Sequence, residues 1–150
     1  MTLSVDRAGL FRRVAAMLYD GLVVLALWLV ATMALIPFFG APAQDEVQVL
    51  IPGAYQWLYQ GYLLAICAAF FCFFWLRGQT LGMVSWRLKV VDRQGLRISH
   101  SQALLRFVGA LLCWASCGLG YLWILFDRQG RSWADILSST EVVVLPKSRD

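Results

Sequence analysis

The chain has 150 residues, of which 60% are hydrophobic, 14% aromatic and only 15% charged, with a formal net charge of +4. Soluble domains are nearer one half apolar and one quarter charged, so this composition excludes an ordinary soluble core. The basic residues flank long apolar runs, which favours contact with anionic lipid at a membrane face over nucleic-acid binding. The length predicts a single membrane domain over residues 1–150, with no room for a separate soluble module.

The first apolar run follows a short polar lead with three arginines and covers about residues 14–37. A bilayer core of roughly 30 Å is crossed by about 20 apolar helical residues, so this run predicts a span. It is longer than the apolar part of a cleaved signal sequence. It also contains an acid, Asp20. A charge at membrane depth costs on the order of 2.5–3.5 kcal/mol, so we expect Asp20 to have a partner or a function.

Two further apolar runs cover about residues 54–76 and 103–126. The run at residues 54–76 has aromatic residues at both ends, as is typical of the membrane interface. The third contains small residues, including Gly118 and Gly120, which allow close helix packing or break the run into a re-entrant pair. The fold class we predict is an all-α membrane protein with three hydrophobic segments, the third of which either spans the bilayer or is split.

A polar connection between the second and third runs predicts a small cytoplasmic β-hairpin. Residues 86–91 alternate with period two, residues 92–95 have the composition of a turn, and residues 96–98 would form the returning strand. A further β-prone run, residues 140–145, needs a partner for its backbone groups. It joins this hairpin if the tail lies on the same side of the membrane.

The distribution of Lys and Arg predicts the orientation. Three precede the first run, none lies between the first and second, five lie between the second and third, and four follow the third. The positive-inside rule then places the N-terminus and the polar connection in the cytoplasm. A complete third crossing would put the basic tail outside, whereas a re-entrant third segment keeps it inside, and both topologies remain open.

Two ionisable side chains in or next to the first apolar run, Arg13 and Asp20, are candidates for a functional site. Arg13 and Asp20 share one helix face but lie about 10 Å apart along the axis, too far for an easy salt bridge. Each is therefore expected to have another partner, and Arg106 or a residue of the tail is a candidate partner for Asp20. Asp20 is then either a titrating acid on a proton or cation pathway, or part of a buried structural pair.

The usual catalytic and ligand-binding motifs do not occur in the sequence. It has no phosphate-binding loop, nucleophile elbow, Cys-x-x-Cys pair or His-rich metal spacing. The four cysteines lie in apolar runs and are expected to be packing residues, and His100 is expected to be a solvated loop residue. We expect neither an enzyme nor a cofactor or metal site.

Several short motifs occur in a fixed order along the chain. They are Arg13-x-x-Ala16-x-x-x-Asp20, Gly78-Gln79-Thr80-Leu81-Gly82, Leu88-x-Val90-Val91-Asp92-x-x-Gly95, Arg106, Gly118-x-Gly120, Phe126-Asp127-Arg128 and Asp135-x-x-x-x-Thr140. In this order they resemble the RDD family of membrane proteins, over roughly residues 7–145. The family is named for one arginine and two aspartates, which by position are Arg13, Asp20 and Asp135.

The resemblance implies a bacterial inner-membrane protein, and transport, including cation/proton exchange, has been proposed for some members of the family. The chain departs from the pattern at Ala134, where a histidine usually precedes the second aspartate, and at Met83, which is often basic. A proton-transfer role of that histidine would be missing here.

Two hypotheses follow. The protein is either part of a small transport or exchange unit in which Asp20 titrates, or a non-transporting scaffold or partner protein. In the second case Arg13, Asp20, Arg106 and Asp135 form a structural network. So small a bundle implies a homo- or hetero-oligomer, and the sequence identifies no ligand.

Overall fold

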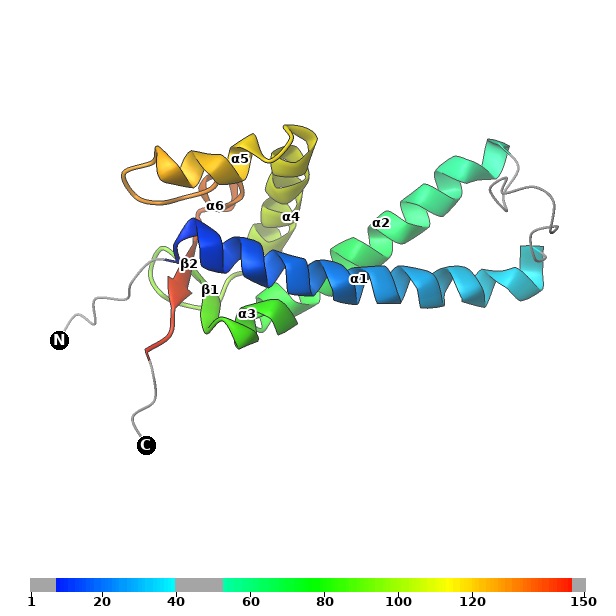
Figure 1. Ribbon diagram of the computed structural model, residues 1–150, viewed down its shortest axis with the longest axis horizontal. Coiled ribbons are helices and arrows are strands. Elements are labelled where there is room, and N and C mark those ends of the chain that lie inside the picture. The colour runs from blue at the N-terminus through cyan, green and yellow to red at the C-terminus, as the bar shows by residue number, and fades with distance from the viewer. Residues whose placement is uncertain (1–7, 40–52, 147–150) are drawn as a thin grey trace. The chain divides into compact units, whose positions relative to one another are not determined.

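Figure 1 shows the computed structural model, which describes residues 8–39 and 53–146. The described chain is mostly helical, with one small antiparallel sheet, as predicted. It separates into two compact units. Residues 21–70 form a helical hairpin, called here the hairpin unit. The described residues before Gly21 and after Phe70 form the other, called here the polar unit because it contains the buried charged network.

Two helices contribute to the hairpin unit, α1 (Leu10–Phe39) and α2 (Gly53–Leu76). Both are long and apolar enough to cross a membrane, which confirms the first two predicted spans. Their outward-facing leucines, valines and aromatic residues are largely exposed in the isolated chain. A surface of this kind is stable only in contact with lipid or with other apolar helices.

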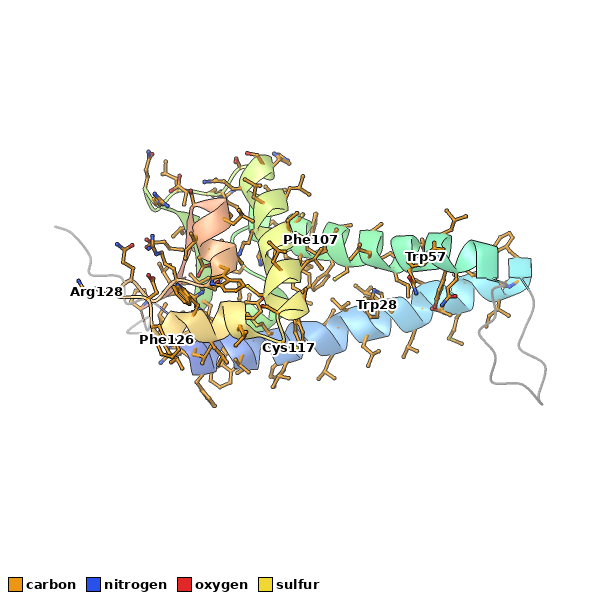
Figure 2. All side chains as sticks on the ribbon, turned by 90° about the horizontal axis from the view of Figure 1, so that it is seen from above. Trp28, Trp57, Phe107, Cys117, Phe126 and Arg128 are labelled. Carbon is orange, nitrogen blue, oxygen red and sulfur yellow. The ribbon has the colours of Figure 1, made fainter. Side chains whose placement is uncertain are left out.

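Polar contacts between the helices hold the hairpin unit together. The indole of Trp28, labelled in Figure 2, donates to the carbonyl of Leu63 over 3.0 Å. The hydroxyl of Thr32 donates to the carbonyl of Trp28, and therefore accepts from the hydroxyl of Tyr59, 2.7 Å away. These bonds satisfy polar groups that would otherwise face an apolar environment.

The polar unit contains the beginning of α1, the end of α2 and all of the remaining elements. In chain order these are α3 (Leu81–Ser85), β1 (Leu88–Asp92), α4 (His100–Ala115), α5 (Leu119–Leu122), the 3-10 helix η1 (Trp123–Leu125), α6 (Trp133–Ser138) and β2 (Thr140–Val144). The core includes the fully buried side chains of Leu88, Val90 and Val142 from both strands. It therefore joins segments that are about 50 positions apart in the sequence.

The third apolar segment is a bent pair rather than one straight helix. The axes of α4 and of residues 119–125 differ in direction by 107°. Cys117 and Gly118 have left-handed backbone conformations at the bend (φ 55° and 86°), as is common where a helix ends. Figure 2 places Cys117 at this bend and Phe126 at the end of the returning segment. Of the two arrangements expected for this segment, the structure contains the split one.

The sheet confirms the C-terminal strand and pairs it with the first strand of the predicted hairpin, whereas the second strand of that hairpin is absent. β1 pairs with β2 in antiparallel register, with Val90 opposite Val142. The returning strand predicted at residues 96–98 does not form, because the backbone N–H of Val90 donates to Gly78 (2.7 Å) at the other edge of β1. The chain after β1 instead closes on Asp92, whose carboxylate accepts from the amides of Gln94 and Leu96.

The pairing also brings the tail to the beginning of α1. The amide of Ala8 donates to the carbonyl of Val142 over 3.0 Å, and Figure 1 shows β2 beside the start of α1. The start of the first span, the strand that follows the second span, and the C-terminal strand therefore lie together in one unit.

Candidate functional site

The site is built around Asp135, whose backbone is positioned by a capping box at the start of α6. The hydroxyl of Ser132 accepts from the amide of Asp135 (3.3 Å), and the carboxylate of Asp135 accepts from the amide of Ser132 (3.0 Å). This reciprocal pair satisfies two donors that the first turn of a helix leaves unpaired. It also fixes the direction of the Asp135 side chain, which is 1% exposed.

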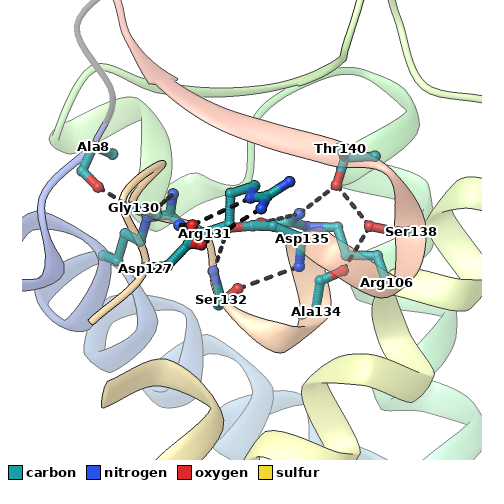
Figure 3. Close-up of polar contacts among 11 residues, drawn as sticks. Ala8, Arg106, Asp127, Gly130, Arg131, Ser132, Ala134, Asp135, Ser138 and Thr140 are labelled. Carbon is teal, nitrogen blue, oxygen red and sulfur yellow. Dashed lines mark hydrogen bonds and ion pairs between the residues drawn. The ribbon is translucent and has the colours of Figure 1, made fainter. Parts of the chain in front are cut away.

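Two arginines from different helices bind this carboxylate, and Arg106 is labelled beside Asp135 in Figure 3. Nη1 of Arg106, on α4, donates to Oδ1 of Asp135 over 2.6 Å. Nη1 of Arg13, on α1, donates to Oδ2. Both arginines are buried, with 4% of Arg13 and 5% of Arg106 exposed. A single carboxylate thus joins α1, α4 and α6.

The electrostatics of the network keep Asp135 ionised. Burial by itself raises the pKa of the carboxyl group, but the charges of Arg106 and Arg13 and the hydrogen bonds to the carboxylate outweigh it. The pKa of Asp135 falls to about 2. Removing one member of such a buried pair leaves an unpaired charge and typically costs about 3–5 kcal/mol.

A chain of hydroxyl groups extends the network to β2. Nη1 of Arg106 also donates to the hydroxyl of Thr140, the first residue of β2, over 2.6 Å. Ser138 donates its proton to the carbonyl of Ala134 (2.6 Å), so it accepts from Thr140 (2.7 Å). The hydrogen bonds therefore run in one direction, from Arg106 through Thr140 and Ser138 to the α6 backbone. The hydroxyl groups of Thr140 and Ser138 each donate their proton in this series.

Arg13 also binds backbone carbonyl groups that precede α1 and α6. Its Nε donates to the carbonyl of Ala8 (3.0 Å), and Nη2 donates to the carbonyl of Gly130 (3.3 Å). A bidentate or branched pattern of this kind uses the planar guanidinium, and a lysine could not reproduce it. Arg13 therefore connects the first turn of α1 to the loop before α6.

Ala134, the position at which the sequence departs from the expected histidine, serves packing here. Its backbone and methyl group lie against Gly109 of α4, so closely that a Cβ on Gly109 would approach Cα of Ala134 to 2.7 Å. This contact lets α4 and α6 approach each other next to Arg106 and Asp135.

Asp20 occupies a separate position in the same unit. Its Oδ2 accepts from the hydroxyl of Thr80 (2.5 Å) and its Oδ1 from the backbone amide of Gly82 (2.8 Å). Thr80 is fully buried and caps α3, accepting from the amide of Met83. Gly82 lies directly on the α1 backbone, where a side chain would collide with the carbonyl of Ala16. Asp20 thus fastens the α3 segment to α1.

The four residues selected from the sequence are therefore divided between two clusters. Arg13, Arg106 and Asp135 come together, whereas Asp20 accepts hydrogen bonds from Thr80 and Gly82. Arg106, a candidate partner of Asp20, binds Asp135 of the tail instead. The separation of Arg13 from Asp20 agrees with their spacing along α1.

Sequence reasoning did not predict that hydroxyl side chains take part in the site. The residues concerned are Thr80, Ser132, Ser138 and Thr140, all of them buried. One signal was present in the sequence, since Ser132-x-x-Asp135 has the spacing of a capping box. Among the described residues, no three His, Cys, Asp or Glu side chains are grouped as metal ligands.

The model of the RDD family matches residues 7–139 of the chain. The chain belongs to the RDD family. No curated protein and no solved structure matches it. With its two candidate spans, this RDD protein is an integral membrane protein. If the family is named for the residues that correspond here to Arg13, Asp20 and Asp135, then Arg13 pairs with Asp135. Asp20 fastens the α3 segment instead.

Proposed function

We propose that this RDD protein is a structural subunit of a bacterial inner-membrane assembly and does not transport by itself. The observation that carries the proposal is that both carboxylate oxygens of Asp135 accept hydrogen bonds. Its two carboxylate oxygens accept from Arg13, Arg106 and the amide of Ser132. A buried carboxylate with a pKa of about 2 does not exchange a proton at physiological pH. Such a group is suited to holding helices together.

The size of the membrane-crossing part supports the same conclusion. Polar pathways through a bilayer must be enclosed by protein, and two helices cannot surround one. A homo- or hetero-oligomer is therefore required for any pathway. In our proposal the polar unit is the part presented to partner subunits, and no enzymatic step or cofactor is involved.

The orientation that we propose places the polar unit in the cytoplasm. The start of α1 and the polar connection carry most of the basic residues, and β2 is paired with β1 in the same unit. In this orientation the basic residues face the anionic headgroups of the cytoplasmic leaflet.

Reconstitution of the full chain tests the proposal. The purified protein is placed in vesicles of phosphatidylglycerol and phosphatidylethanolamine with a trapped pH-sensitive dye, and a Na⁺ or K⁺ gradient is imposed. We expect no faster pH change than in protein-free vesicles. Native mass spectrometry from nanodiscs should release more than one copy of the chain or a stoichiometric second protein. A solitary monomer from native membranes would argue against the scaffold.

Cation/proton exchange at Asp20 is a second candidate, favoured by one observation. Among the described residues, the donors to Asp20 are the neutral Thr80 hydroxyl and Gly82 amide, so a proton can bind without breaking an ion pair with them. Flux in the wild type that disappears in Asp20→Asn, with the helical circular dichroism retained, would establish exchange and overturn the scaffold proposal. Asp127→Asn, which alters a partly exposed acid paired with Arg131, is the matched control.

A further inference from the structure

The buried arginine and aspartate network is not electrically neutral. Within the described part of the chain, Arg13 and Arg106 contribute two positive charges to it and Asp135 one negative charge, and all three residues are at most 5% exposed. Asp20 is engaged by Thr80 and Gly82. Unbalanced charge is unfavourable in a buried environment, because the group loses its hydration without gaining a counterion. The network is therefore electrostatically suited to one more anion.

Two buried donors next to this network lack an acceptor among the residues that the structure describes. They are Nε of Arg106 and Nε1 of Trp75, and both side chains are more than nine-tenths buried. The guanidinium carbon of Arg106 lies over the Trp75 ring, 5.2 Å from its centre. The nearby acceptors are already used, since Asp135 and Thr140 both accept from Nη1 of Arg106.

We propose that Arg106 and Trp75 form a binding site for a phosphate group. Excess positive charge selects an anion, and an arginine edge is the side chain best suited to phosphate oxygens. Because the two donors sit on different side chains, a group with several oxygens can serve both more readily than a single-atom ligand. The site is distinct from Asp20 and does not depend on the scaffold proposal.

The position of Trp75 indicates where such a phosphate comes from. Trp75 lies one residue before the end of the second candidate span, Gln56–Leu76, at the depth where phospholipid headgroups are found. On α4, the neighbours Leu104, Leu105 and Val108 are exposed apolar side chains that acyl chains can cover. An anionic phospholipid headgroup and free inorganic phosphate share the chemistry of the site.

Thermal unfolding of the full chain in dodecyl maltoside, followed by helical circular dichroism, tests the site with three probes. They are dioleoylphosphatidylglycerol, inorganic phosphate, and monoolein, which carries no phosphate. We expect a phosphate-bearing probe to raise the wild-type midpoint by roughly 3 °C or more, and monoolein to leave it unchanged. A shift with the phospholipid alone assigns a lipid headgroup, and a shift with inorganic phosphate as well assigns the phosphate group itself.

Trp75→Phe is the informative variant, because it removes the indole donor and retains an aromatic ring, although a smaller one. Without probe its midpoint should be lower than that of the wild type, because the smaller ring leaves a cavity at this buried position. With probe the shift should fall to a third or less. Trp114→Phe, on an exposed indole of α4, should retain the full shift.

A second variant keeps the test decisive if Trp75→Phe does not fold. Arg106→Lys preserves the charge but removes the Nε donor, and it should reduce the phosphate-induced shift in the same way. The inference is overturned if neither phosphate-bearing probe shifts the wild type, as when a water molecule bridges the two donors. It is also overturned if Trp75→Phe responds as strongly as the wild type.

Discussion

Arg13 and Asp135 are 122 positions apart in the sequence and form a buried ion pair between the first turn of α1 and α6. Arg106 binds the other oxygen of the same carboxylate. The pair thus connects the beginning of the first span to the C-terminal part of the chain. Its contribution to stability can be measured directly.

Loss of Arg13 should destabilise the protein strongly. Arg13→Ala leaves Asp135 paired with Arg106 but removes a charged hydrogen bond and the bonds to Ala8 and Gly130, so we expect a loss of about 1.5–3 kcal/mol or more in the free energy of unfolding. Arg12→Ala, on the exposed neighbouring position, should change it by about 0.5 kcal/mol or less. Denaturant unfolding in detergent measures both. Equal effects of the two variants would contradict the buried pair.

The ion pair also predicts a pH dependence. The pKa of Asp135 is lowered in the folded state to about 2 from its usual value of 3.8. The resulting stabilisation, about 2 kcal/mol, is therefore fully present above pH 5 and is lost as the pH falls from about 4 to 2. Asp135→Asn should lack this component of the acid-induced loss. Identical acid profiles of the variant and the wild type would exclude it.

The hydroxyl of Thr80 should be essential for the attachment of α3. Thr80→Val preserves the shape of the side chain but removes the donor to Asp20 and the acceptor for Met83, which should cost about 1–3 kcal/mol. Thr80→Ser restores the hydroxyl and should recover most of the loss. Thermal unfolding by circular dichroism compares the three proteins. A serine variant as unstable as the valine variant would indicate a packing effect.

Two glycines of the chain should respond in opposite ways to alanine. Gly82→Ala places a methyl group on the carbonyl of Ala16, so a destabilisation of about 1–3 kcal/mol or more is expected. Gly21 has no neighbouring atom within 4 Å of an added Cβ, and Gly21→Ala should be neutral or stabilising because alanine favours helix. Unfolding midpoints in detergent measure the contrast. Similar midpoints for the two variants would contradict the contact between α3 and α1.

The side of the membrane on which the tail lies can be tested with a reporter fused after Asp150. β2 is paired with β1, so both must lie on one side, and the positive-inside rule predicts the cytoplasm. A green fluorescent protein fusion should fluoresce, and an alkaline phosphatase fusion at the same position should be inactive. The reverse pattern would require a complete third crossing.

Local physical chemistry made part of this structure predictable from the sequence. The lengths of the first two apolar runs exceed the thickness of a bilayer core, which predicts both spans. The spacing of Arg13 and Asp20 on one regular helix predicts that they do not bond directly. The β-prone run near the C-terminus indicated a strand. In each case the relevant distances lie within one element, whose geometry a few neighbouring residues determine.

Only the tertiary structure decided which distant groups are partners. β1 pairs with β2 rather than with residues 96–98, because the other edge of β1 is used by Gly78. Arg106 binds Asp135 and leaves Asp20 to Thr80, because the bend at Cys117 and Gly118 returns the chain so that α6 packs on α4. Equivalent residue types compete for the same partners, and sequence spacing cannot rank them. The choice depends on packing between elements that are far apart in the chain.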